Sequence, residues 1–163
     1  MSASARVSAI LHLEKMLRAP RARVFAAFVD EGALAAWWGP NDFTVPDVEI
    51  CAREGERYRF TMQPPEGAAF HITGEFREVE PPQRLVYTFE YEEPDPDDQE
   101  TLVTLSFVDV ADGTLLVLDQ GPFATKARRA LHETGWAETL AGLERFLALG
   151  VTHTSDRRDS DDS

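Results

Sequence analysis

The chain has 163 residues, of which 43% are hydrophobic and 10% aromatic, so it can bury the core of one globular domain. Its formal net charge of −13 argues against nucleic acid and anionic membrane surfaces as partners, because like charges repel. No apolar run reaches the roughly 18 residues of a membrane-spanning helix, so no membrane insertion is expected. Residues 1–6 lack the features of a signal peptide, and a single cysteine, Cys51, excludes an internal disulfide; both observations favour a cytoplasmic location.

The predicted domain occupies residues 6–149, and residues 1–5 before it are expected to be flexible. Residues 150–163 contain several acidic side chains, no aromatic side chain and few apolar ones, so they are expected to form a disordered tail. The domain opens with a strand, because apolar side chains alternate with polar ones from residue 7 to residue 17.

Two short helices are predicted after this strand. Pro20 supplies a backbone angle suited to a first helical turn, so it should open a helix through residue 29. Asp30 can accept hydrogen bonds from the first turn of a second helix, which Gly39-Pro40 ends.

Six strand-like runs follow, separated by turn-forming residues. They are residues 44–53, 56–62, 69–80, 84–91, 101–110 and 114–120. Glu54-Gly55 is expected to make a tight hairpin turn, and Asp112-Gly113 is the strongest hairpin signal in the chain. Because such short connections join antiparallel neighbours, the runs and the first strand predict one antiparallel sheet of about seven strands.

A long helix is predicted from residue 124 to residue 149. Trp136, Leu140, Leu143 and Leu147 recur there at spacings of four, three and four, which forms one stripe of a helix. A lone helix after so many strands has to bury this stripe against the sheet. The prediction is therefore an α+β fold, in which a curved antiparallel sheet surrounds a C-terminal helix and leaves a space between them.

Motifs of common cofactor and metal sites are absent from the sequence. There is no Gly-Lys-Ser/Thr motif and no Gly-x-Gly-x-x-Gly, which argues against nucleotide chemistry, and no cofactor is expected. His132-Glu133 resembles the start of a two-histidine zinc motif, but Trp136 stands where the second histidine belongs. The pair is therefore expected on the surface of the last helix, and no metal is expected.

Aromatic side chains are abundant, and some of them are expected to line the space under the helix, because small-molecule sites are concave and largely apolar. The predicted cavity wall consists of Trp37, Trp38, Phe60, Phe70, Tyr87, Phe89 and Trp136. His71, in the middle of a strand, is the candidate polar contact. The favoured interpretation is a protein that binds a small hydrophobic or aromatic molecule.

Two other functions stay open. An enzyme on the same scaffold would need His71, Asp47, Glu49 or Asp119 to enter the cavity beside a second polar group, for acid-base or hydrolytic chemistry; no catalytic residue is assigned. A protein-interaction module could use residues 90–100, which hold seven acidic residues and no basic one, although a solvated loop is the simpler interpretation.

Several phrases occur in an order that is typical of a known family. They are Ala19-Pro20 with Val24-Phe25, Leu34 with Trp37-Trp38-Gly39-Pro40, Gly74-Glu75-Phe76, Arg84-Leu85-Val86-Tyr87-Thr88-Phe89, Asp112-Gly113-Thr114, and Gly135-Trp136 with Leu140 and Leu143. Together they resemble the START-like (SRPBCC) superfamily, in particular the bacterial family related to the C-terminal domain of the activator of Hsp90 ATPase.

The resemblance covers residues 7–149 and implies a helix-grip fold, with two short helices and a long C-terminal helix over a cavity. The superfamily binds lipids, sterols, polyketides and other hydrophobic molecules, and some members are cyclases, hydrolases or dehalogenases. It has no universal catalytic residue, so the resemblance implies none here. A co-chaperone role is not expected to transfer, because the eukaryotic protein joins this domain to a separate N-terminal one.

Overall fold

The computed structural model describes residues 9–162, with side chains from residue 9 to residue 149. Within this part, seven antiparallel strands form one sheet in the order β1-β7-β6-β5-β4-β3-β2, which confirms the predicted α+β helix-grip fold. The strands are β1 (Leu11–Leu17), β2 (Thr44–Glu49), β3 (Arg57–Gln63), β4 (Phe70–Glu80), β5 (Arg84–Tyr91), β6 (Thr101–Val110) and β7 (Gly113–Gly121). The helices are α2 (Arg21–Val29), α3 (Glu31–Trp37) and α4 (Lys126–Asp162). The predicted flexible segment, residues 1–5, lies outside the described residues.

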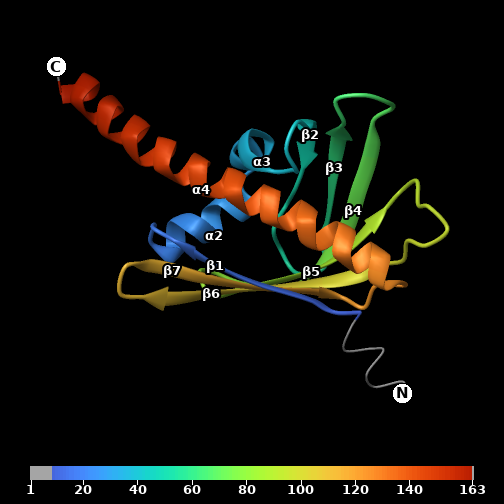
Figure 1. The fold of residues 1–163 in the computed structure, drawn as a ribbon. Coiled ribbons are helices and arrows are strands. Elements are labelled where there is room, and N and C mark those ends of the chain that lie inside the picture. Colours follow the sequence, from blue (N-terminus) through green and yellow to red (C-terminus); the bar gives the residue numbers. More distant parts are fainter. Residues whose placement is uncertain (1–8, 163) are drawn as a thin grey trace.

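The sheet is strongly bent. In Figure 1, β3 and β4 stand steeply across the direction of β6 and β7, and α4 runs diagonally, with β6 and β7 below it and the upper parts of β3 and β4 above it. The first strand, β1, pairs with the last, β7, from Leu11 opposite Gln120 to Leu17 opposite Thr114. β1, at one end of the sheet, also contacts α4, and its Lys15 pairs with Glu144 of the helix at 3.0 Å.

The two predicted hairpins have different outcomes. Val110 pairs with Gly113, so β6 and β7 are joined by a two-residue loop at the predicted place. The predicted tight turn at Glu54-Gly55 is present, because the Glu56 N–H donates to the Arg53 carbonyl at 3.0 Å and Gly55 has a positive φ of 90°. It does not join the two strands directly, however, since residues 50–56 separate β2 from β3. The Gly55 N–H donates to the Phe76 carbonyl of β4 at 2.8 Å, so this wider loop is attached to the next strand of the sheet.

The predicted helix cap and the predicted core stripe are both confirmed. The Asp30 carboxylate accepts a hydrogen bond of 2.8 Å from the Ala33 N–H at the start of α3. On α4, the side chains of the stripe are all buried: Trp136, Leu140, Leu143 and Leu147. The hydrophobic effect on this face holds α4 against the sheet.

The last helix is longer than its apolar stripe. Its backbone continues to Asp162, past the predicted end at residue 149. The expected disordered tail over residues 150–163 and the domain limits stay predictions, since no side chain is described there. Within residues 9–162, none of the helices combines the length and apolar character needed to cross a bilayer.

Candidate functional site

A cavity of about 330 Å³ lies between α4 and the sheet. Three parts of the chain form it: the segment after α3, the strands β3 to β5, and the first half of α4. Its lining consists of Trp38, Pro40, Phe43, Met62, Phe70, Ile72, Phe89, Tyr91, Leu131, His132, Thr134, Gly135, Trp136, Glu138 and Thr139. This volume and this mainly apolar, aromatic wall are typical of small-molecule sites.

Four of the predicted wall residues surround this cavity: Trp38, Phe70, Phe89 and Trp136. Trp38 reaches it because it follows the last residue of α3 with an extended backbone (φ −68°, ψ 144°), which turns its side chain away from the helix. Its ring meets the ring of Trp136 edge to face, with centroids 5.0 Å apart. Two segments distant in sequence thus share one aromatic wall.

The other predicted aromatic residues lie outside this cavity. Trp37 is buried between helices, where its indole N–H donates to the Ala27 carbonyl of α2 at 2.9 Å. Phe60 and Tyr87 pack around Tyr58, with ring centroids 5.3 and 5.4 Å from it. They border a separate void of about 20 Å³, which is room for a water molecule only.

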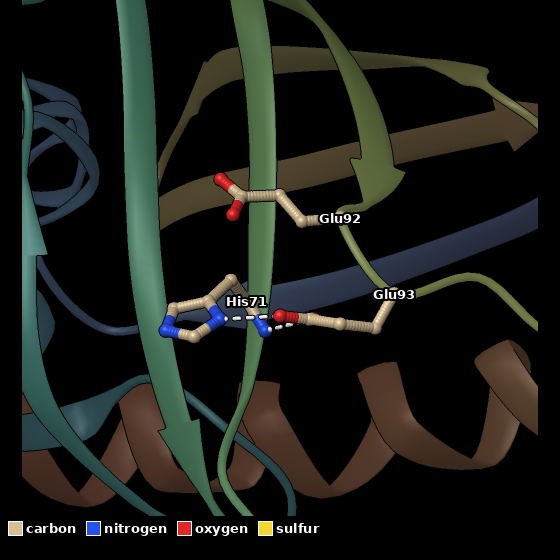
Figure 2. Close-up of side chains that lie close together, drawn as sticks. All are labelled: His71, Glu92 and Glu93. Atoms are coloured by element: carbon tan, nitrogen blue, oxygen red, sulfur yellow. Dashed lines mark hydrogen bonds and ion pairs between the residues drawn. The ribbon is translucent and has the colours of Figure 1, made fainter.

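His71 is not part of the cavity lining. As Figure 2 shows, its ring faces Glu93, and Nδ1 donates to the Glu93 carboxylate at 2.7 Å. The same carboxylate accepts from the His71 backbone N–H at 2.9 Å. These hydrogen bonds lower the pKa of Glu93 below its ordinary value, because they stabilise the ionised carboxylate. His71, the predicted polar contact for a ligand, is therefore hydrogen-bonded to Glu93 instead.

The region around His71 also contains a group of potential metal donors. Atoms of His71, Glu92 and Glu93 lie within 4.8 Å of one another. Both oxygens of Glu92, however, accept hydrogen bonds from the Arg59 guanidinium, at 2.7 and 2.9 Å. That hydrogen bonding lowers the pKa of Glu92 and gives both its oxygens a cationic partner, with which a metal ion would have to compete. The group is a network of ion pairs, and the expected absence of a metal stays a prediction.

The carboxylates considered for acid-base chemistry lie elsewhere. Asp47 and Glu49 are exposed on the edge strand β2. Asp119 accepts a hydrogen bond of 2.7 Å from His12 Nδ1 across the β1–β7 pair. None of these side chains is part of the cavity lining.

His132 is the histidine that lines the cavity. Its ring packs against Phe123, Phe89 and Tyr91, with centroids 4.8, 5.7 and 5.9 Å away. The expectation that His132 lies on the surface is therefore wrong. Burial lowers the pKa of His132 to about 4, because the apolar surroundings disfavour the charged imidazolium. The ring is neutral at pH 7.

Tyr91 lies beside His132, and together they form a polar end of the cavity. The Tyr91 hydroxyl is 3.4 Å from His132 Nε2, which is long for a hydrogen bond. Burial, with a smaller effect of Asp98, raises the pKa of Tyr91 above its ordinary value, so the phenol also stays neutral. Two uncharged polar groups thus face each other with a weak mutual bond.

Trp136 contributes its ring to the cavity and its polar atom to the core. Its indole N–H donates to Gln120 Oε1 at 2.7 Å, and Gln120 Nε2 donates to Thr101 Oγ1 at 2.8 Å. All three side chains are buried. The indole N–H is therefore already paired with a group of the sheet, and this chain of hydrogen bonds holds α4 in position over the cavity.

Some lining residues that were not predicted could have been identified from the periodicity of the sequence. His132 is four residues before Trp136, so extending the α4 stripe by one turn would have included it. Tyr91 shares the alternation of Phe89 on β5, and Ile72 shares that of Phe70 on β4. Leu131, Thr134 and Glu138, at the side of the α4 stripe, carry no such signal.

Comparison with known proteins assigns the chain to a family. Residues 18–148 match the profile of the family described as Activator of Hsp90 ATPase homolog 1-like protein (AHSA1). The chain belongs to this family. A comparison with curated proteins gives no match.

Solved structures of AHSA1-like proteins have the same fold. A Chromobacterium violaceum protein is 26% identical with a TM-score of 0.77, covering 83% of this chain and 94% of its own. An AHSA1 protein from Silicibacter pomeroyi is 27% identical with a TM-score of 0.77, covering 86% and 99%. A Rhodobacter sphaeroides protein is 26% identical with a TM-score of 0.76, covering 87% and 94%. These likenesses agree with the predicted START-like resemblance.

Proposed function

We propose that this AHSA1-family protein binds a small, mainly apolar molecule in the cavity between α4 and the sheet. The observation that supports this best is the cavity of about 330 Å³, bordered by aromatic side chains from three separate parts of the chain. Space of this kind favours an apolar guest, because each buried methylene group contributes about 0.8 kcal/mol. In this proposal Trp38, Phe70, Phe89 and Trp136 are wall residues.

Gly135 offers a direct way to fill the cavity. It lies in α4 and lines the cavity, and a Cβ added there would meet only Pro40 Cγ, at the ordinary contact distance of 3.9 Å. Because a Cβ has room here and Gly135 lines the cavity, we expect a leucine at this position to project into the cavity. Gly135→Ala adds a single methyl group to the same place and is the matched control.

The test uses N-phenyl-1-naphthylamine, a neutral dye that becomes fluorescent in apolar surroundings. We expect the wild-type protein and Gly135→Ala to bind the dye, and Gly135→Leu to bind it at least about tenfold more weakly, because the side chain occupies the same space. Energy transfer from the tryptophans reports that the dye is bound to the protein, and the comparison with Gly135→Leu locates it in the cavity. Ala137→Leu, on the exposed side of α4, should leave binding unchanged.

A dye affinity of Gly135→Leu equal to that of the wild type would contradict the proposal. Thermal unfolding separates this result from a folding defect. Both Gly135 variants should be at least as stable as the wild type, since replacing a helical glycine by alanine contributes up to about 1 kcal/mol.

The other functions considered from the sequence have less support. His71, Asp47, Glu49 and Asp119 are absent from the cavity lining, so they are not placed to act on a molecule bound in this cavity. A protein partner at residues 90–100 stays a prediction. There, Asp95 and Asp98 already pair with Arg128 at 2.9 and 3.5 Å. The cytoplasmic location also stays a prediction.

A further inference from the structure

We propose that the cavity selects uncharged ligands that carry a hydroxyl group, and that it rejects carboxylates of the same size and shape. This inference rests on the proposed function and specifies the chemical class of the ligand. Two independent features support it: the charges around the cavity and the polar pair at one end of it.

The charges around the cavity disfavour an anion. Among the described residues, the lining contains no lysine or arginine, and its one carboxylate is Glu138. Glu138 lies in the wall formed by α4 and accepts a hydrogen bond of 3.0 Å from the Asn41 backbone N–H. A bound carboxylate would lose its hydration, gain no counter-ion and be repelled by Glu138.

Two cations, Arg128 and Arg129, lie within about one turn before His132 on α4, and neither is part of the lining. The Arg128 guanidinium contacts the carboxylates of Asp95 at 2.9 Å and Asp98 at 3.5 Å. A ligand anion would have to compete with both, so Arg128 offers little compensation.

The polar end of the cavity fits a hydroxyl group. The Tyr91 O–H is a donor, and neutral His132 can accept at Nε2 when the ring proton is on Nδ1. A ligand hydroxyl beside the pair can accept from Tyr91 and donate to His132, replacing the long contact of 3.4 Å with two shorter ones. The neutral state of His132 at pH 7 is consistent with this role.

The apolar side chains of the wall give the ligand its orientation. Phe43, Met62, Phe70 and Ile72 offer no strong hydrogen-bonding group to the cavity. The hydroxyl group is therefore expected at the His132 end and the hydrocarbon part against these side chains, because a buried hydroxyl without a partner is destabilising.

Four naphthalene derivatives of similar shape test the selectivity by displacement of N-phenyl-1-naphthylamine at pH 7. They are 2-naphthol, 2-methoxynaphthalene, naphthalene and 2-naphthoate. We expect 2-naphthol to bind about 3- to 10-fold more tightly than naphthalene, from one or two net hydrogen bonds. The ether, which accepts but cannot donate, should fall between them. The carboxylate 2-naphthoate should bind at least about 30-fold more weakly than 2-naphthol.

Two variants test which side chains cause the preference. Tyr91→Phe and His132→Phe should each reduce the advantage of 2-naphthol over naphthalene while leaving the affinity for naphthalene within about twofold. Tyr87→Phe is the matched control, because Tyr87 is a buried β5 tyrosine outside the cavity lining and should not alter the preference. Thermal unfolding verifies that all three variants are folded.

The outcomes separate this inference from the proposed function. If 2-naphthoate binds as tightly as 2-naphthol, or the hydroxyl preference persists in both Tyr91→Phe and His132→Phe, the selectivity is overturned and binding in the cavity stands. If neither the dye nor any of the four compounds binds the wild type, the proposed function itself fails.

Discussion

At the scale of single residues, His132 makes the stability of the protein depend on pH. Its folded pKa of about 4 lies below the ordinary value of 6.5, so the unfolded chain binds the proton first as pH falls. The folded state should therefore lose stability between about pH 6.5 and pH 4, by about 3 kcal/mol at full protonation. His132→Phe keeps an aromatic ring and removes this loss. The difference in free energy of unfolding between the two proteins, from urea titrations at several pH values, should change accordingly.

His12 provides a control, because its pKa shift is opposite in direction to that of His132. Hydrogen bonds to Asp119 and Glu14 raise the pKa of His12, so its contribution to stability is present at acid pH and disappears as pH rises through the folded pKa. His12→Asn should therefore lose stability relative to the wild type only on the acid side. Parallel pH profiles of His132→Phe and the wild type would contradict the burial of a neutral His132.

At the scale of elements, Gly74 allows β3, β4 and β5 to join closely. The Tyr58 phenol on β3 reaches past Gly74 on β4 and donates to the Thr88 carbonyl on β5 at 2.6 Å. A Cβ at Gly74 would overlap that carbonyl oxygen and approach the Tyr58 ring to 2.7 Å. Gly74→Ala should therefore cost more than about 3 kcal/mol of unfolding free energy in urea titrations. A loss under about 1 kcal/mol would show that the strands can move apart, and Gly135→Ala serves as the tolerated substitution.

The elements themselves were largely predictable, because local patterns determine them. The stripe from Trp136 to Leu147 identified the buried face of α4, and alternation identified the strands. Part of the site could also be predicted, since aromatic side chains on the inner face of a curved sheet are buried under the helix that covers it. The structure has Phe70 in the cavity wall and His71 outside it, because neighbouring strand residues point to opposite faces.

The rest of the site depends on register between strands, which local patterns do not carry. Tyr87, Phe89 and Tyr91 share one face of β5, yet only the last two reach the cavity. Tyr87 lies opposite Phe76 and Tyr91 opposite Ile72. The position of each ring along the paired strands therefore decides which ring lines the cavity. That position follows from the bulge between Phe76 and Glu78 and from the packing of α4, both of which are tertiary.

At the scale of the whole molecule, Gln120 connects the helix to the sheet. It is 1% exposed, and it joins Trp136 of α4 to Thr101 of β6 through bonds of 2.7 and 2.8 Å. Gln120→Met should cost about 1–3 kcal/mol, because it leaves the Trp136 N–H and the Thr101 hydroxyl buried without this partner. Combining it with Trp136→Phe should cost less than the sum of the two single changes, which a double-mutant cycle in urea measures.

Thr139 gives a matched comparison for this connection. Its hydroxyl donates to the Gly135 carbonyl within α4 at 2.7 Å, so Thr139→Val removes a partly buried hydrogen bond that joins no other element. We expect Thr139→Val to lower stability by less than Gln120→Met, because it disconnects no other element from α4. Gln120→Met should weaken dye binding as well, because Trp136 forms part of the cavity wall and loses the bond that orients it. Equal dye affinities in Gln120→Met and the wild type would mean that apolar packing alone positions α4 over the cavity.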